Sequence, residues 1–163
     1  MAHISVLGLG NWGTAIARLW LLEGHKVKGW TIEQEVYESI TMHGVNEKYL
    51  PDHPVKGMDV SMHLSEVMEG SEIIVLAVPS SVILDVVQDI MPHLQPSHVI
   101  LDLAKGLAPG KRLISQAIKE QLREEGKTNP LAVLTGPTIA PEAAGGVMTT
   151  ALVASEDHAV ANR

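Results

Sequence analysis

Short runs of consecutive apolar residues alternate along the chain with longer segments in which apolar residues recur every three or four positions. The short runs have the length of buried strands, and they predict strands at residues 4–7, 25–30, 73–78, 99–103, 131–135 and 150–154. The amphipathic segments predict helices at residues 12–23, 33–42, 65–68, 80–90 and 111–125. We expect Ser80 or Ser81 to cap the fourth helix. The Pro-, Gly- and His-rich segment 44–58 predicts a long ordered loop.

Strands that are apolar throughout and are separated by helices indicate a parallel sheet covered on both faces. The sequence therefore predicts an α/β fold, Rossmann-like and doubly wound, with a mostly parallel sheet. Its 163 residues suffice for one domain and are too few for two ordinary ones. After Ala154 a helix begins, with Ser155 as its expected cap, and stops after about two turns, which favours a truncated chain over a frayed tail.

Composition and charge exclude several classes of function. Hydrophobic residues make up 45% of the chain, so a sizeable core is available. Because 12 basic residues face 19 acidic ones, the net charge is −7, and we expect no nucleic-acid partner. The absence of Cys excludes disulfides, thiolate metal sites and cysteine catalysis, and the 8 His residues are scattered without a metal-site pattern. Without a basic leader or an apolar run of ~20 residues, we expect a cytoplasmic protein with no membrane partner.

The first predicted strand runs directly into a glycine-rich turn that opens the first helix. This turn has the spacing G-x-G-x-x-G, with Gly8, Gly10 and Gly13 at the three glycine positions. The first glycine permits the tight turn, the second lets a pyrophosphate approach the backbone, and the third lets the helix pack close to the strand. Free amides and the dipole at the helix start favour an anion. The context predicts a dinucleotide site.

The end of the second predicted strand bears on the choice between NAD and NADP. Glu33 lies 20 positions after Gly13, near the spacing typical of an acid that binds ribose hydroxyls. It could equally be a solvated acid at the start of a helix. No Arg follows the strand to accept a 2′-phosphate, so the cofactor is NAD or NADP, with NAD favoured.

Three further strand ends are expected at the same edge of the sheet, where open α/β sheets bind ligands. They carry Ser80 and Ser81, then Lys105, then Gly136 and Thr138. Lys105 is either a solvated loop residue or an ammonium that holds an anionic or carbonyl oxygen. Thr138 offers a hydroxyl near the same crevice.

Five segments together resemble the amino-terminal domain of NAD(P)-dependent glycerol-3-phosphate dehydrogenases. They occur in the family's order and span nearly the whole chain. The Asn-Trp pair in the glycine turn and the Tyr-Leu-Pro loop are more specific than the glycines alone. The five segments are residues 8–17, residues 46–51 (Asn-Glu-Lys-Tyr-Leu-Pro), residues 78–80, residues 105–106 and residues 136–142.

The resemblance implies oxidation of sn-glycerol 3-phosphate to dihydroxyacetone phosphate, or the reverse reaction, which supplies phospholipid synthesis. It implies that Asn11 and Trp12 lie along the cofactor pyrophosphate and that the substrate is a small phosphorylated molecule. The other implied cofactor contacts are Ile32, Val82, Lys105 and Ala140, and the implied substrate contacts are Lys105, Gly136 and Thr138.

The family's second, helical domain, which supplies the catalytic lysine, has no counterpart in residues 1–163. We therefore expect residues 1–163 to form the NAD(P)-binding domain, to contain no catalytic residue and to turn over little alone. A homodimer is expected for a complete protein. Two alternatives stay open: a non-catalytic dinucleotide-binding module, and another dehydrogenase of the 6-phosphogluconate or ketopantoate type.

Overall fold

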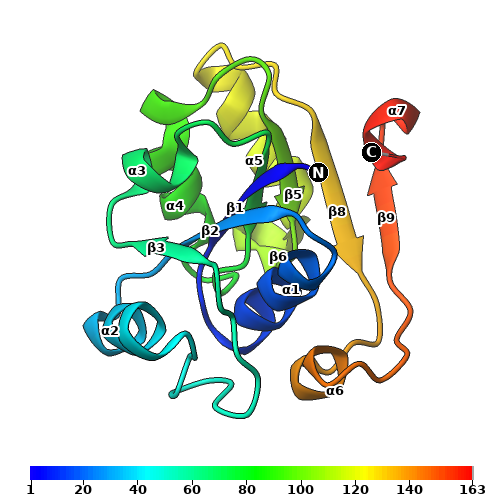
Figure 1. The fold of residues 1–163 in the computed structure, drawn as a ribbon. Coiled ribbons are helices and arrows are strands. Elements are labelled where there is room, and N and C mark those ends of the chain that lie inside the picture. Colours follow the sequence, from blue (N-terminus) through cyan, green and yellow to red (C-terminus); the bar gives the residue numbers. More distant parts are fainter. Residues whose placement is uncertain (163) are drawn as a thin grey trace.

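The computed structural model of the protein describes residues 1–162; Arg163, the last residue of the expected domain, lies outside the described residues. Strands and helices alternate along the chain as the hydrophobic pattern predicts (Figure 1). The strands are β1 (His3–Leu7), β2 (Lys26–Trp30), β3 (Asp59–Ser61), β4 (Ile73–Leu76), β5 (Val99–Asp102), β6 (Leu107–Ala108), β7 (Arg112–Leu113), β8 (Leu131–Thr135) and β9 (Leu152–Ser155).

The helices between the strands confirm most of the predicted ones, with shifted ends. The long loop expected over residues 44–58 is also present. The helices are α1 (Asn11–Leu22), α2 (Gln34–His43), α3 (Leu64–Met68), α4 (Ile83–Ile90), α5 (Ile114–Glu124), α6 (Ala140–Ala144) and α7 (His158–Ala161), with short 3₁₀ turns at Met91–His93 and Pro109–Lys111.

Seven of the strands form one sheet in the order β3-β2-β1-β4-β5-β8-β9. Every pair in it is parallel except β8–β9, which is antiparallel. From β1 the chain first builds outward through β2 and β3, then returns to add β4, β5 and β8 on the other side. This reversal is the doubly wound topology, and it confirms the predicted fold class.

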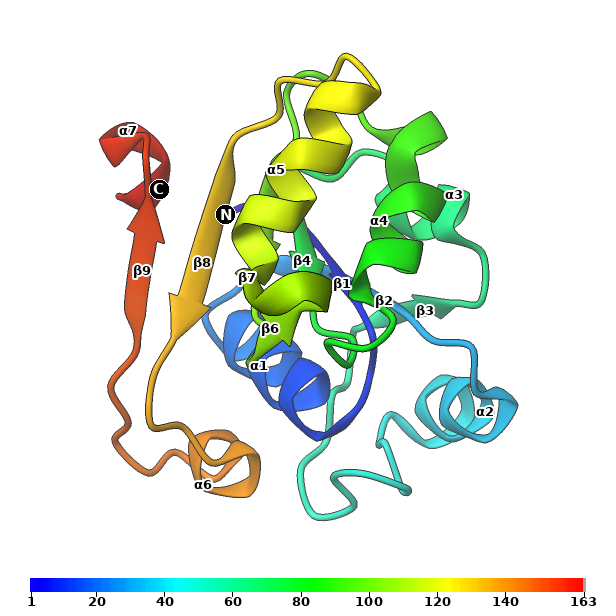
Figure 2. The same ribbon diagram turned by 180° about the vertical axis from the view of Figure 1, so that it is seen from behind.

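Each face of the sheet buries its own apolar core. On one face, α3, α4 and α5 pack against the strands, with Ile74, Leu76 and Ile118 among the fully buried side chains. On the other face, α1 and α2 cover Val6 and Val75, which are also fully buried. Figures 1 and 2 show α1 in front of the sheet in one view and α4 and α5 in front in the reverse view. Strands buried on both faces explain the uninterrupted apolar runs in the sequence.

The two predictions of serine caps are wrong, because neither α4 nor α7 is capped by a serine side chain. Helix α4 begins only after a turn in which the amide of Val82 donates to the carbonyl oxygen of Pro79 (3.1 Å), so neither Ser80 nor Ser81 caps it. Helix α7 is capped by Asp157, whose carboxylate accepts from the amide of Ala159 at 2.9 Å. The hydroxyl of Ser155 donates instead to the carbonyl oxygen of Leu131 across the sheet (2.8 Å).

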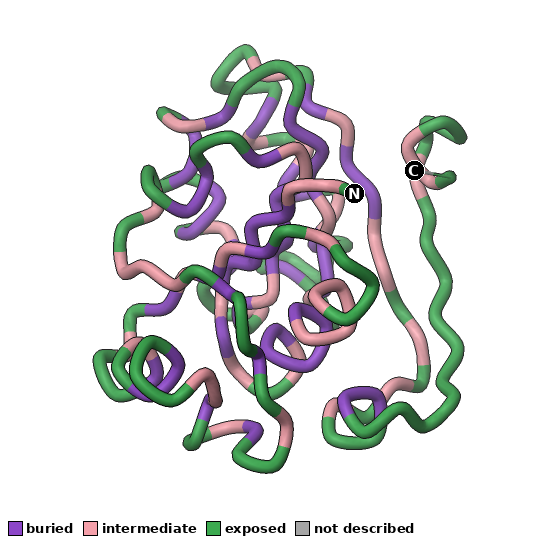
Figure 3. Tube along the Cα trace, in the orientation of Figure 1, coloured by how far each residue is buried: buried purple, intermediate pink, exposed green. Residues whose placement is uncertain are grey.

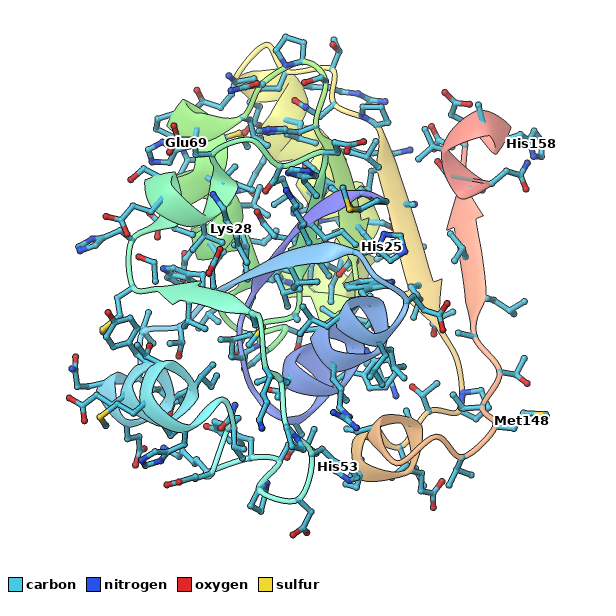
Figure 4. The ribbon with its side chains drawn as sticks, in the orientation of Figure 1. His25, Lys28, His53, Glu69, Met148 and His158 are labelled. Carbon is cyan, nitrogen blue, oxygen red and sulfur yellow. The ribbon has the colours of Figure 1, made fainter. Side chains whose placement is uncertain are left out.

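The segment that leads from α6 into β9 is the most exposed part of the chain. Figure 3 shows a mostly exposed trace from residue 145 to the end of β9, in contrast to the buried central strands. Met148 is 97% exposed and points away from the fold in Figure 4. None of the helices formed by residues 1–162 is long and apolar enough to cross a bilayer.

Candidate dinucleotide site

A crevice of about 960 Å³ opens at the carboxyl ends of the central strands. It lies where the order of strands reverses between β1 and β4, the position at which open α/β sheets bind ligands. Most of the predicted contact residues meet there although they are far apart in the sequence. Those that line the crevice are Gly8, Gly10, Asn11, Trp12, Ile32, Val82, Lys105, Thr138 and Ala140.

The three glycines of the turn occupy three different environments. Gly8 has φ +104°, and a Cβ there would lie 2.9 Å from the backbone of Ala77. A Cβ on Gly13 would lie 1.9 Å from the carbonyl oxygen of Gly8, because α1 packs directly against the turn. A Cβ on Gly10 would meet nothing within 4 Å, so this glycine leaves open space at the crevice. The arrangement agrees with the separate reasons for each glycine.

The start of α1 is left available to an anion. Gly10 is the residue before the helix, no side chain caps the helix, and no acidic residue lies in its first turn. The first amides of a helix have no partner within it, and they carry a partial positive charge. The helix start and the open space at Gly10 therefore have the geometry and partial charge that could hold a phosphate group.

Asn46 braces the glycine turn from the 44–58 loop. Its side chain is fully buried, and its Nδ2 donates to the carbonyl oxygen of Leu9 and to the hydroxyl of Thr14, both at 2.8 Å. The Thr14 hydroxyl donates to the same carbonyl oxygen (3.1 Å), and Asn46 Oδ1 accepts from the amide of Tyr49 (3.2 Å). Sequence analysis placed Asn46 in a specific motif without finding this role, because its partners lie far away in the sequence.

At the end of β2, the side chain of Glu33 is held by the same loop. The hydroxyl of Tyr49 donates to Glu33 Oε1 at 2.9 Å, and the ammonium of Lys48 donates to Oε2 at 2.5 Å. Lys48 also forms an ion pair with Glu35. Glu33 and Tyr49 both line the crevice. Glu33 is the residue directly before α2 and its side chain is 31% exposed, as expected of an acid at the start of a helix, and it also lies in the crevice wall, so both interpretations of Glu33 stay predictions.

These contacts change the titration of the groups involved. The hydrogen bond from Lys48 lowers the pKa of Glu33, and the bond from Tyr49 acts in the same direction. Glu33 and Glu35 raise the pKa of Lys48, and Glu33 raises the pKa of Tyr49. Near neutral pH, Glu33 is therefore a carboxylate that accepts from a protonated phenol and an ammonium.

The predicted lysine stands on a turn held by a buried acid. Asp102 at the end of β5 is 1% exposed, and its Oδ1 accepts from the amide of Ala104 at 2.8 Å. Burial raises the pKa of Asp102 to about 6. Lys105, which follows Ala104 in the chain, is exposed and lines the crevice. Asp102 was missed by sequence analysis, although a single carboxylate in the apolar run 99–103 was a usable signal.

Helix α6 brings the segment 136–140 to the crevice by docking on α1. The guanidinium of Arg18 on α1 donates to the carbonyl oxygen of Ala144 (3.2 Å) and to that of Pro54. Ala144 also packs in a small apolar cluster with Ala15 and Leu50. This docking explains how Thr138 and Ala140 reach the crevice although they follow β8.

Two predicted residues do not line the crevice. Gly13 lies beneath the turn, in contact with Gly8 as described above. Gly136 faces the chain that enters β9, since a Cβ there would lie 2.5 Å from the carbonyl oxygen of Thr150. A substrate contact by Gly136 stays a prediction.

A second hollow, of about 510 Å³, is lined by residues of the amino ends of β1 and β2 and of the turn after α3. Lys28 is one of its lining residues, and its ammonium donates to the carbonyl oxygens of Glu66 (3.0 Å) and Glu69 (2.8 Å). Lys28 and Glu69 are labelled in Figure 4. The ammonium of Lys28 is thus used to end α3. Within residues 1–162, no group of three or more His, Asp or Glu side chains is placed to hold a metal ion.

Comparison with known proteins gives a consistent result. The family profile described as "NAD-dependent glycerol-3-phosphate dehydrogenase N-terminus" matches residues 3–161. A glycerol-3-phosphate dehydrogenase (NAD(P)+) from Syntrophotalea carbinolica is 37% identical over 98% of this chain and 48% of its own length. One from Acidobacterium capsulatum is 40% identical over 99% of this chain and 49% of its own length. The chain thus spans about half the length of these curated relatives.

The solved structures agree with this match. The crystal structure of glycerol-3-phosphate dehydrogenase from Coxiella burnetii superimposes with a TM-score of 0.90 at 31% identity. The match covers 99% of this chain and 49% of that one.

Proposed function

This chain belongs to the family of NAD-dependent glycerol-3-phosphate dehydrogenases, whose amino-terminal part it matches, and we propose that it is the cofactor-binding part of such an enzyme. The reaction is oxidation of sn-glycerol 3-phosphate to dihydroxyacetone phosphate, or its reverse. The observation that carries the proposal is the cradle formed by Gly10 and the uncapped start of α1. Family membership argues against the 6-phosphogluconate and ketopantoate alternatives.

The residues of the crevice fit a nicotinamide dinucleotide. The backbone at Gly10 and the amides of Asn11 and Trp12 bind the pyrophosphate, because the helix dipole favours negative charge there. Ile32 and Val82, both exposed in this structure, flank the adenosine and nicotinamide sides, and Ala140 contacts the cofactor. When bound, the oxidised nicotinamide accepts a hydride from C2 of the substrate.

The substrate is a small phosphorylated alcohol held near Lys105 and Thr138. Both residues line the crevice, and the ammonium of Lys105 can bind an anionic or carbonyl oxygen. Oxidation requires removal of the C2 hydroxyl proton while the hydride leaves. We propose that a base outside residues 1–163 removes that proton. This chain alone therefore binds the cofactor but oxidises little or no substrate. Homodimer formation and a cytoplasmic location remain predictions.

The test is a titration of this chain with NADH, followed by fluorescence or calorimetry. We expect saturable binding in the wild type and a loss of at least about 10-fold in affinity in Gly10→Ala, because the added methyl occupies the space of the pyrophosphate. Thermal unfolding of Gly10→Ala should stay close to that of the wild type, since its Cβ meets no protein atom within 4 Å.

Two results would contradict the proposal. Absence of NADH binding by folded wild-type protein removes the cofactor site itself. A longer protein that contains this chain joined to a second domain like that of the relatives should oxidise sn-glycerol 3-phosphate. If it binds NADH without doing so, the chain is the non-catalytic module.

A further inference from the structure

Arg18 joins the helix that follows the glycine turn to two segments that are far away in the sequence. Its Nε donates to the carbonyl oxygen of Ala144 at 3.2 Å, and Nη1 of the same guanidinium donates to the carbonyl oxygen of Pro54. Ala144 is the last residue of α6, and Pro54 belongs to the 44–58 loop. In the same loop, His53 lies beside the end of α6, since a Cβ on Gly145 would be 3.5 Å from its ring (Figure 4). One planar cation thus bridges α1, α6 and the loop.

The rest of the contact between α6 and the fold is small. The helix has 5 residues and lies between two long connections, one from β8 and one into β9 (Figures 1 and 2). Its buried side chains are Ala143 and Ala144, each of which buries a single methyl group. The chain that follows, residues 145–154, is exposed throughout. Because a segment with few buried apolar contacts opens locally at low free energy, the bonds from Arg18 are a large part of what holds α6.

The place where α6 docks continues into the crevice. Along α1, Trp12, Ala15 and Arg18 follow one another at intervals of three residues, so each is a neighbour of the next on the helix surface. Trp12 lines the crevice and packs, with Ala140, against the small apolar cluster that contains Ala15. Ala140 is the first residue of α6, and Thr138 lies two residues before it. A movement of α6 away from α1 therefore removes both residues from the crevice wall.

We infer that Arg18 is a positioning residue: by fixing α6 to α1 and to the 44–58 loop, it keeps Thr138 and Ala140 in the crevice wall. Arg18 itself does not line the crevice, so it acts through α6. The inference rests on the proposed function, in which Thr138 contacts the substrate, and adds a residue outside the site that sets the substrate side of it. Among the residues that the structure describes, no acid forms an ion pair with Arg18, so its donors serve main-chain oxygens.

Amide hydrogen exchange tests the docking directly, in this chain without ligand. The amides of Ala143, Gly145 and Val147 report on α6, because they donate to carbonyl oxygens within residues 139–142 (3.0, 2.9 and 2.9 Å). We expect Arg18→Ala to speed their exchange by about 10-fold or more, since two bonds from a charged donor are lost. The amide of Lys127 reports on local opening at the end of α5, far along the chain from α6, and should change by less than about 2-fold.

Two further variants separate docking from general destabilisation. Arg18→Lys keeps the positive charge but lacks the planar fork that reaches two oxygens at once. Exchange of the α6 amides in this variant should lie between that of the wild type and that of Arg18→Ala. Arg112→Ala is the matched control, because Arg112 forms an exposed ion pair with Glu120 and does not line the crevice. It should leave exchange in α6 unchanged.

The functional measurement compares cofactor with substrate. Because Arg18 contacts neither the glycine turn nor the first residues of α1, Arg18→Ala should weaken NADH binding by this chain by less than about 3-fold. In a complete protein, the KM for sn-glycerol 3-phosphate should rise about 3- to 10-fold with kcat nearly unchanged, because Thr138 is in place only in the docked fraction of molecules. A purely structural role would instead lower the amount of folded enzyme and leave KM unchanged.

Three outcomes would overturn the inference. Equal exchange of the α6 amides in the wild type and in Arg18→Ala means that α6 docks without Arg18. Faster exchange together with an unchanged KM means that the docked helix does not set the substrate side of the crevice. If exchange responds as expected but the folded wild type binds no NADH, the proposed function itself fails, and Arg18 is a structural residue only.

Discussion

Replacing Asn46 by Ala should weaken cofactor binding through the backbone of the glycine turn. The side chain contacts no predicted ligand position; it donates to the carbonyl oxygen of Leu9 and the hydroxyl of Thr14, and accepts from the amide of Tyr49. Without these bonds the turn loses its support from the 44–58 loop. The effect on cofactor binding is therefore indirect, because the glycine turn must become ordered again when the pyrophosphate binds.

The expected loss of stability follows from the contacts. Each of the two donated bonds contributes about 0.5–1.5 kcal/mol net, and a partner left unpaired in the interior costs about 1–3 kcal/mol. The Leu9 oxygen keeps its bond from Thr14, so the partner mainly affected is the half-buried amide of Tyr49. Because that amide is only half-buried, its cost is counted at about 1 kcal/mol, and with the two bonds the total is about 2–4 kcal/mol, or a fall in Tm of about 5–15 °C. A domain with a stability of about 5–15 kcal/mol remains folded.

The assay pairs urea unfolding with NADH titration, and the control is Asn129→Ala. Asn129 is also a buried asparagine with two donated bonds, to the carbonyl oxygens of Gln95 (2.7 Å) and His98 (2.9 Å), and it does not line the crevice. Both variants should lose similar stability, while only Asn46→Ala should weaken NADH binding, by about 10-fold or more. Equal NADH affinity in the two variants would refute the bracing role.

Further changes test the turn and the strand end beside it. Burial raises the pKa of Asp102 from 3.8 to about 6, so the protonated side chain stabilises the fold fully below about pH 4, and this contribution is lost as the pH rises through 6. Asp102→Asn should therefore raise the free energy of unfolding at pH 8 by up to about 3 kcal/mol. A lower free energy of unfolding in urea at pH 8 would contradict this. Gly13→Ala should destabilise the fold by about 1–3 kcal/mol or more, because its Cβ would lie 1.9 Å from Gly8 O; an unchanged Tm would be inconsistent with that packing. In a complete protein, Lys105→Ala should lower kcat/KM and leave NADH binding nearly unchanged; equal loss of both would indicate a cofactor role or misfolding.

Local pattern was sufficient for the framework of this protein. Uninterrupted apolar runs predicted β1, β4 and β8 because a strand buried on both faces has no polar side to show. The spacing of Gly8, Gly10 and Gly13 predicted the turn, because each glycine answers a steric demand within a few residues of itself. Fold class and the position of the crevice follow from these two signals.

Several short elements, though not the five-residue α3, escaped the sequence analysis because they have too few residues to show a period. Strand β3 has 3 residues, β6 and β7 have 2 each, and α6 has 5. The short strands form because they pair with a neighbouring strand. Strand β3 pairs with the edge of β2, and β6 pairs with β7, so that α5 begins only at Ile114. The direction of β9 was equally undetermined, since a single apolar run pairs in either sense with β8.

The finer chemistry of the crevice was decided by the tertiary structure alone. Asn46 is 37 residues from Leu9, and Tyr49 is 16 residues from Glu33, so no local window contains either pair. Such contacts depend on where the 44–58 loop lies after the sheet has formed. The sequence by itself therefore determined the glycine turn and the helix that starts from it, through backbone requirements that are local. Only the folded chain determined which side chains support the glycine turn and which carboxylate lies in the crevice wall, because hydrogen bonds join residues by their distance in space.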